Sequence, residues 1–154
     1  MRDADESFGV SYLQARISAE FPLAVHIGIS VERADDGGLE LIAPFAPNAN
    51  FKGTAFGGSL FSIAVLAGWA WVTRYLATKR IAADAVIQES TIHYLAPVHG
   101  VLKATLLSPS AGNIEKFQKM MQRAGRGRLW LGVEIRQGTV LATRFEGIFA
   151  ATRR

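Results

Sequence analysis

The sequence contains no cysteine among its 154 residues. This absence excludes a disulfide framework, a thiolate metal site and a cysteine nucleophile. Histidine is also scarce, and His26, His93 and His99 show no metal-ligand spacing with one another or with an acidic residue. We therefore expect no metal site.

Neither sign of charge dominates, because 17 basic and 13 acidic side chains give a net charge of +4. This balance fits an anionic partner and ordinary solubility equally. The longest apolar run, Leu60–Val72, is shorter than the ~20 residues needed to cross a bilayer, so no membrane segment is expected. The acidic start, Met1–Ser7, lacks the basic and apolar regions of a secretory signal, so a cytoplasmic location is expected.

The apolar fraction of 49% is enough for one packed domain, which we expect to cover residues 1–154. The spacing of Leu13, Ile17 and Phe21 predicts an amphipathic helix that ends near Pro22. Apolar residues then alternate over 25–31 and again over 39–45, which predicts two strands. The Asp-Asp-Gly-Gly segment 35–38 between them is typical of a hairpin turn.

Residues 59–77 are apolar on nearly every side, which predicts a long helix buried by the rest of the fold. A short helix is expected around Ile114–Met121. Four more strands are expected at 86–95, 101–107, 129–136 and 139–152. The simplest arrangement is an α+β domain in which an antiparallel sheet curls around the long helix. Such a sheet keeps an edge and an outer face free for a symmetric partner.

Three motifs resemble a known family in their order and spacing: Asn50–Leu60, Thr91–Pro97, and the closing strands around Gly138 and Gly147. They resemble the hot-dog fold acyl-CoA thioesterases, and residues 53–60 with 67–69 are most similar to the thioesterase-like domain of the YiiD C-terminal type. The resemblance implies a hot-dog fold and acyl-thioester substrates. It implies no cofactor other than coenzyme A as part of the substrate, and a site formed across the interface of a homodimer or homotetramer.

Two positions depart from that pattern. Phe56 stands where the common pattern has a histidine, and Val65 stands where many members carry a catalytic aspartate on the buried helix. The usual general base is therefore missing from the helix, and the mechanism stays open.

The start of the long helix is the first candidate for chemistry. Free N–H groups and the positive end of the helix dipole at Gly57 and Gly58 could stabilise an oxyanion, with Gly58 as the catalytic donor. The alternative is that these glycines only form a tight turn. Asn50 could orient the substrate, or it could simply form a turn. The further residues expected to contact substrate are Thr54, Phe56, Gly57, Ser59, Phe61 and His93.

Glu89 is the best candidate for the general base, because it lies in the middle of a predicted strand. An acid facing a cleft would have a raised pKa in the useful range for this role. The alternative is an ordinary strand acid facing solvent. His93 shares the strand parity of Glu89 and could neighbour the same cleft. Ser59 lacks the flanking glycines of a nucleophile elbow, so we expect it to assist the loop or ligand.

Five basic residues lie close together in the last third of the sequence, at Lys116, Lys119, Arg123, Arg126 and Arg128. Arginine binds phosphate well, so this cluster could hold the phosphates of coenzyme A. It could equally be a solvated helix face. No nucleic-acid partner is expected, because stacking aromatic residues are not interleaved with the basic ones.

The leading functional hypothesis is hydrolysis of acyl-CoA or acyl-carrier thioesters by water, with a carboxylate base and an oxyanion site at the helix N-terminus. A hot-dog dehydratase or hydratase is an alternative, but no residue clearly supplies the histidine that such enzymes pair with an acid. A non-catalytic module that binds acyl thioesters is a second alternative, which the residues at positions 56 and 65 favour.

Overall fold

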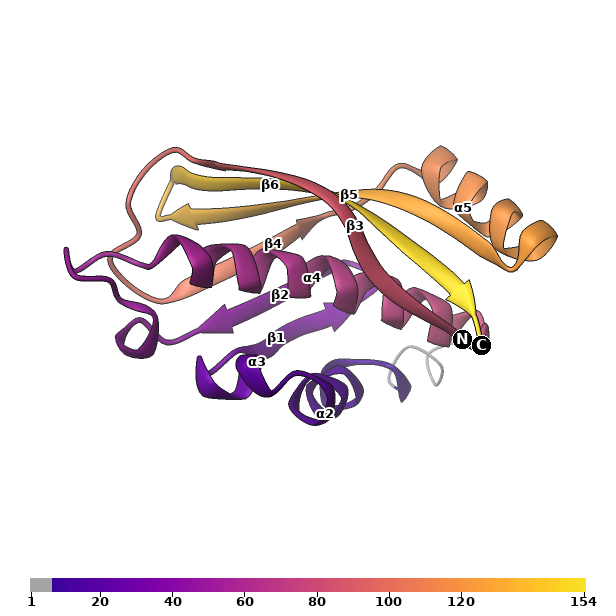
Figure 1. Ribbon diagram of the computed structural model, residues 1–154, viewed down its shortest axis with the longest axis horizontal. Helices are drawn as coiled ribbons and strands as arrows, with labels where there is room; N and C mark the ends of the chain where they lie inside the picture. The colour runs from indigo at the N-terminus through magenta and orange to yellow at the C-terminus, as the bar shows by residue number, and fades with distance from the viewer. Residues whose placement is uncertain (1–6) are drawn as a thin grey trace.

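A six-stranded antiparallel sheet curves around one long helix, α4, in the computed structural model, which describes residues 7–154 (Figure 1). The strand order is β1-β2-β4-β5-β6-β3. The helices are α2 (Val10–Glu20), α3 (Pro22–His26), the 3₁₀ turn η1 (Ala46–Asn48), α4 (Gly57–Thr78) and α5 (Ala111–Ala124). The strands are β1 (Ser30–Asp35), β2 (Gly38–Ala43), β3 (Ala83–Tyr94), β4 (Leu102–Leu107), β5 (Arg126–Gln137) and β6 (Val140–Arg153). This architecture confirms the expected α+β class and the hot-dog arrangement.

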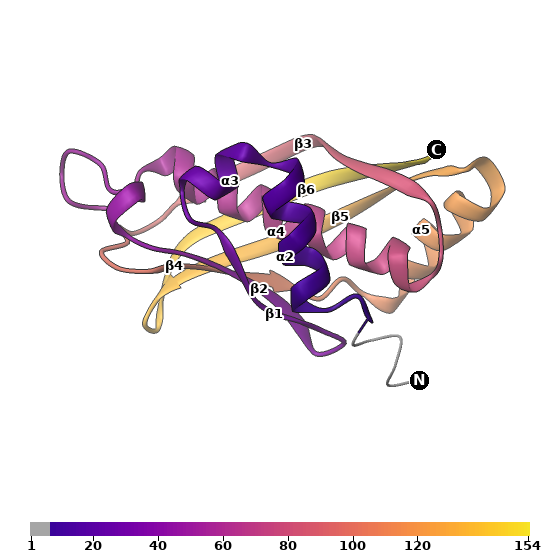
Figure 2. The same ribbon diagram turned by 90° about the horizontal axis from the view of Figure 1, so that it is seen from below.

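Helix α4 is the centre of the hydrophobic core, because the sheet covers one side of it and α2 and α3 lie on the other (Figures 1 and 2). Gly68 lets α4 approach β6 closely, since a Cβ atom there would overlap the ring of Phe149. With 22 residues, α4 is longer than the apolar run that the sequence suggested, and by length and composition it could cross a membrane. Core packing accounts for its apolar composition, because 61% of its most apolar window is buried inside the fold.

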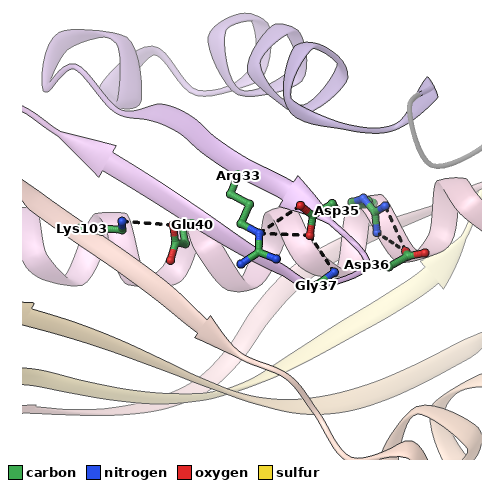
Figure 3. Close-up of polar contacts among 7 residues, drawn as sticks. Arg33, Asp35, Asp36, Gly37, Glu40 and Lys103 are labelled. Carbon is green, nitrogen blue, oxygen red and sulfur yellow. Dashed lines mark hydrogen bonds and ion pairs between the residues drawn. The ribbon is translucent and has the colours of Figure 1, made fainter. Parts of the chain in front are cut away.

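The hairpin between β1 and β2 confirms the turn expected at 35–38 (Figure 3). The carboxylate of Asp35 accepts hydrogen bonds from Gly37 N at 2.7 Å and Arg33 Nε at 3.1 Å. The neighbouring Asp36 pairs with Arg74 of α4 at 3.3 Å, which ties the turn to the core helix. Burial lowers the pKa of the Arg74 guanidinium.

The expected strand over residues 25–31 is only partly correct. Residues Pro22–His26 form the short helix α3, and β1 begins at Ser30. Pro22 occupies the first turn of α3, where its fixed φ angle favours a helix and its missing N–H costs nothing. Of the alternating apolar residues that suggested a strand, Val25 is exposed on α3, whereas Ile29 and Val31 are buried.

The long strand β3 lies at the edge of the sheet and pairs only with β6 among the described strands. Its register with β6 shifts between Ile87 and Glu89, where Gln88 forms a β-bulge. Ile87 lies opposite the buried Phe149, so it faces the core, whereas Glu89 lies opposite Ile148. Since a bulge adds one residue to one strand, it moves every later side chain to the other face.

Candidate functional site

The start of α4 carries two backbone donors that are available to a ligand. The N–H groups of Gly57 and Gly58 have no hydrogen-bond acceptor within residues 7–154. The next two N–H groups, of Ser59 and Leu60, both donate to Phe56 O, at 3.0 and 3.1 Å. Free N–H groups at the positive end of a helix dipole favour a ligand oxygen that carries negative charge.

Two aromatic rings flank these donors. The Tyr94 hydroxyl donates to the carbonyl oxygen of Gly57 at 3.0 Å, and a Cβ atom at Gly57 would lie 3.3 Å from Tyr94 Cζ. On the other side, the Phe56 ring occupies the space that a Cβ atom at Gly58 would need. A Cβ atom at Gly58 would therefore require the Phe56 ring to move, whereas a Cβ atom at Gly57 would make only a tight contact with Tyr94. A hydrogen bond to an oxyanion between two apolar walls is stronger than the same bond in open water.

The loop before α4 is anchored by Asn48, which the sequence analysis did not select. Asn48 is buried, and its Nδ2 donates to the carbonyl oxygens of Ile27 and Pro44, both at 2.8 Å. The backbone carbonyl oxygen of Asn48 accepts a hydrogen bond from Phe56 N at 2.7 Å. Asn48 therefore connects the end of α3 to the residue that precedes α4. No sequence signal distinguished it from Asn50, two residues later.

The side chain of Asn50 is used within its own loop. Its Nδ2 donates to Thr54 Oγ1 at 2.9 Å, and its Oδ1 accepts from the N–H groups of Lys52 and Thr54 at 2.9 and 3.2 Å. These contacts match the turn-forming alternative for Asn50, because its side-chain amide is hydrogen-bonded within the loop. Gly53, with a φ of 74°, supplies the left-handed residue of this turn.

An apolar groove begins one turn into α4 and has a volume of about 460 Å³. We call it the α4 groove. It lies between α3, α4 and the first half of β3, and its lining includes Leu23, Ile27, Phe61, Val65, Trp69 and Ile87. Among residues 7–154, Ser62 supplies the only hydroxyl group in its lining, and this hydroxyl donates to its own helix at Gly58 O, at 2.8 Å. The groove therefore suits a ligand segment without polar groups.

A second hollow of about 360 Å³ lies beside Gly57, between the loop and the end of β3, and Thr54 and Tyr94 line it. Among residues 7–154, no aspartate, glutamate or histidine lines either this hollow or the α4 groove. Within the same residues no three His, Asp or Glu side chains are grouped so as to hold a metal ion.

The structure brings some of the predicted site residues together and separates others. Phe56, Gly57, Gly58 and Phe61 lie at the start of α4, where Ser59 is buried. Tyr94 joins them and was missed, although it lies in the Thr91–Pro97 motif.

Glu89 and His93 face the other side of the sheet. They lie opposite Ile148 and Arg144 of β6, on the outer face, and both are exposed. The prediction that Glu89 faces a cleft is therefore wrong within one copy of the chain, and its solvent-facing alternative is the one observed. The physical reason is the bulge at Gln88, since a regular strand would put Glu89 on the same inner face as Ile87.

Comparison with known proteins gives a family and a set of similar folds. Residues 10–153 match the model of a family described as "Putative thioesterase (yiiD_Cterm)". A protein of unknown function from Chlorobaculum tepidum TLS is 30% identical over 97% of this chain and 99% of its own, with a TM-score of 0.89. A protein from Shewanella oneidensis, described as a putative thioesterase, is 25% identical over 99% of both chains, with a TM-score of 0.84. A thioesterase from Haemophilus influenzae shares the fold, with 14% identity over 94% of this chain and 90% of its own, and a TM-score of 0.67.

Proposed function

We propose that this chain, which belongs to the YiiD C-terminal thioesterase family, hydrolyses acyl thioesters. The observation that carries the proposal is the pair of free N–H groups at Gly57 and Gly58, one turn from the mouth of the apolar α4 groove. A thioester has a carbonyl oxygen that needs donors and an acyl tail that needs an apolar environment. The two features supply both.

The N–H groups of Gly57 and Gly58 bind the thioester oxygen and stabilise the negative charge that develops on it as water attacks the carbonyl carbon. The tail extends along α4 past Phe61 and Val65. When the tetrahedral intermediate collapses, the bond from carbon to sulfur breaks, and the departing thiolate takes up the proton that the attacking water has lost. The rings of Phe56 and Tyr94 limit the access of other water molecules to the donors.

A homodimer completes the site in this proposal. The 12 residues of β3 form a long edge, which pairs with a strand on one side only in the described chain. An edge of this length favours pairing with another strand. A two-fold axis through the middle of β3 pairs it antiparallel with β3 of a second copy. The Tyr94 end of one copy then lies beside the Ala83 end of the other, close to its α4 groove.

The hydrolysis does not use Glu89 as a base, because Glu89 faces the outer side of the sheet. Among residues 7–154, no carboxylate lines the α4 groove or the hollow beside Gly57. In this proposal the rate enhancement therefore comes from the oxyanion donors and from substrate binding. Such a site typically retains roughly 10³–10⁴-fold catalysis over water. This chemistry predicts slow turnover, and the same lack of a base is the observation that favours the second candidate, a non-catalytic module that binds acyl thioesters.

The test is release of free thiol from a panel of acyl-CoA esters, from acetyl to long-chain, by wild type and three variants. Proline suits the first position of α4, because Phe56 is already extended with ψ 133°. Gly57→Pro therefore removes one N–H donor with little backbone strain. Gly57→Ala is the matched control, since it adds the same Cβ atom and keeps the donor.

We expect kcat of Gly57→Pro to be roughly 10²-fold below that of Gly57→Ala, as for loss of one oxyanion donor. Glu89→Gln should leave turnover unchanged. A drop of about 100-fold in Glu89→Gln would instead identify Glu89 as the base. Acyl-CoA binding without turnover across the panel would establish the binding module.

A further inference from the structure

The α4 groove ends at a definite point along its helix. From its mouth at Phe61, the lining follows one face of α4 through Val65 to Trp69. No later residue of α4 belongs to the lining, although the structure describes this helix from end to end. Val72, the next residue on the same face, is completely buried. A ligand that enters at Phe61 therefore meets a stop at Trp69.

Two aromatic rings form this stop. Trp69 of α4 and Phe21, the residue that follows α2, both line the groove. Their rings meet edge to face, with centroids 4.7 Å apart and an angle of 75° between the planes. Figure 2 shows α2 lying across α4, so the two rings come from crossing helices. Such a pair is stabilised beyond the burial of its surface, which gives the groove a firm end wall.

Arg16 of α2 supports the end wall from outside the groove. Its guanidinium carbon lies 5.4 Å from the centre of the Trp69 ring. Arg16 Nη2 donates to Glu20 and Arg16 Nη1 donates to the Tyr12 hydroxyl, both at 3.0 Å. A cation is attracted to the face of an indole, and these two hydrogen bonds hold the cation in place. The Trp69 ring is therefore fixed between Arg16 and Phe21, and a longer ligand has to break these contacts to pass it.

Between the mouth and the end wall, the groove offers only apolar surface to a chain. Leu23 of α3 and Val86 of β3 belong to the lining, yet they are 60% and 61% exposed. A hydrocarbon chain that covers them removes apolar surface from water. Among residues 7–154, no charged side chain lines the groove. A chain that ends in a charged group would lose its hydration there without gaining a partner.

The distance from the oxyanion donors to the end wall sets a chain length. Trp69 lies about 17 Å beyond Gly58 along the axis of α4. Contact with the indole takes up about 4 Å of this distance, and the side chain leans toward the start of its helix, which shortens it further. An extended hydrocarbon chain advances roughly 1.25 Å per carbon, because its bonds of about 1.5 Å meet at about 111°. The groove therefore holds roughly eight to ten carbons in a line.

We propose that Trp69 limits the length of the acyl chain and so determines the specificity of the hydrolysis. The substrates that it selects are thioesters of straight, uncharged acyl chains of up to roughly ten carbons. This inference rests on the proposed function, because the length is counted from a thioester held at Gly57 and Gly58. It adds the chain length of the substrate and the residue that sets this length.

The experiment first measures, by calorimetry, binding of saturated straight-chain fatty acids to the full chain, since these acids are the products of the proposed hydrolysis. The series runs from butanoate to tetradecanoate, at concentrations below those at which the longer members form micelles. The test variants are Trp69→Ala and the milder Trp69→Phe. Trp71→Ala is the matched control, because Trp71 lies on the same helix, stacks on Tyr75 at 5.3 Å and is not part of the groove lining. Circular dichroism checks the fold of each variant, and kcat/KM is then measured against acyl-CoA chain length for all four proteins.

For the wild type we expect affinity to rise about two- to fourfold with each added methylene until the chain reaches the end wall, and then to level off. Trp69→Ala should move this plateau to chains about two or more carbons longer. Trp69→Phe should move it by about one carbon, because a phenyl ring is smaller than an indole, and this variant decides the outcome if Trp69→Ala does not fold. Trp71→Ala should leave the plateau at the wild-type length.

Affinity that keeps rising through tetradecanoate in the wild type, a plateau at the same length in every variant, or no binding of any fatty acid would overturn the inference. A plateau that Trp71→Ala moves as far as Trp69→Ala would also overturn it, since looser packing of α4 would then be the cause. A wild type that shows the plateau but hydrolyses no acyl-CoA removes only the proposed function. Hydrolysis with the same kcat/KM at every chain length keeps the proposed function and removes Trp69 as its limit.

Discussion

The hydroxyl of Tyr94 donates a hydrogen bond to the carbonyl oxygen of Gly57 at 3.0 Å. This contact joins the last residue of the edge strand β3 to the first residue of α4. Gly57 also carries one of the two free N–H groups, so the same residue that Tyr94 holds presents a donor to the ligand. The position of the proposed oxyanion site thus depends on an aromatic side chain from a different element.

Tyr94→Phe removes this hydrogen bond and keeps the ring. We expect the free energy of unfolding to fall by about 0.5–1.5 kcal/mol, and kcat to fall with little change in KM. Tyr12→Phe is the control. It removes the hydroxyl of Tyr12 on α2, which accepts a hydrogen bond from Arg16 at 3.0 Å. Chemical denaturation and steady-state kinetics check both. If the two variants lose stability equally and keep the same kcat, Tyr94 has only a structural role.

Gly58→Ala tests the space between Phe56 and α4. The new methyl group overlaps the Phe56 ring, so the ring must move away from the donors. We expect turnover to fall at least tenfold, and Gly58→Ala/Phe56→Leu to recover part of it because leucine is narrower. Gly112→Ala on α5 is the control, since nothing lies within 4 Å of its added Cβ atom. A double variant no better than Gly58→Ala would show that the ring is not the obstacle.

The helix at 57–78 and the six strands could be predicted largely from the sequence, because burial imposes their apolar periodicity. The face of the sheet on which Glu89 lies could not be predicted from the sequence. Its side depends on the bulge at Gln88, which is a feature of the pairing between β3 and β6. A strand read alone has a constant alternation, so any residue after the bulge is assigned to the wrong face.

Tertiary contacts explain the other differences. The alternating pattern over residues 25–31 fits a strand, but Pro22 begins the helix α3, which runs to His26, and β1 begins only at Ser30. Asn48 and Asn50 have the same side chain and lie two residues apart. Only the packed structure shows that Asn48 is buried between two carbonyl groups while Asn50 closes its own turn.

Asn48→Ala should destabilise the protein more than Asn50→Ala. It leaves the carbonyl groups of Ile27 and Pro44 without the donor that the buried Asn48 amide supplies, which typically costs about 1–3 kcal/mol. Asn50 is partly exposed, so water can replace its contacts. Urea denaturation of both variants checks the order. Equal losses would mean that the loop does not depend on the buried amide.

Asp35→Asn tests the charge in the β1–β2 turn. The hydrogen bond from Arg33, with help from Gly37 N, lowers the pKa of the Asp35 carboxyl. A lowered pKa in the folded state stabilises the fold above the ordinary aspartate pKa of about 3.9, and this stabilisation is lost as pH falls through the folded-state value. We expect Asp35→Asn to lower Tm slightly at pH 7 and not at pH 2. The difference at pH 7 should shrink at 1 M salt, because the pair is exposed. An equal Tm difference at both pH values would rule out the charge as the cause.

Val65→Phe tests whether the acyl tail occupies the α4 groove. Val65 is half-buried in the lining, so a larger side chain there fills the groove beyond Phe61. Short acyl groups need only the mouth of the groove, whereas long ones need the filled part. We therefore expect kcat/KM to fall at least tenfold for long-chain acyl-CoA and to stay within twofold for acetyl-CoA. Val140→Phe is the control, because it adds the same bulk to an exposed residue at the start of β6. A uniform loss across chain lengths would place the tail elsewhere, since a blocked groove must discriminate by length.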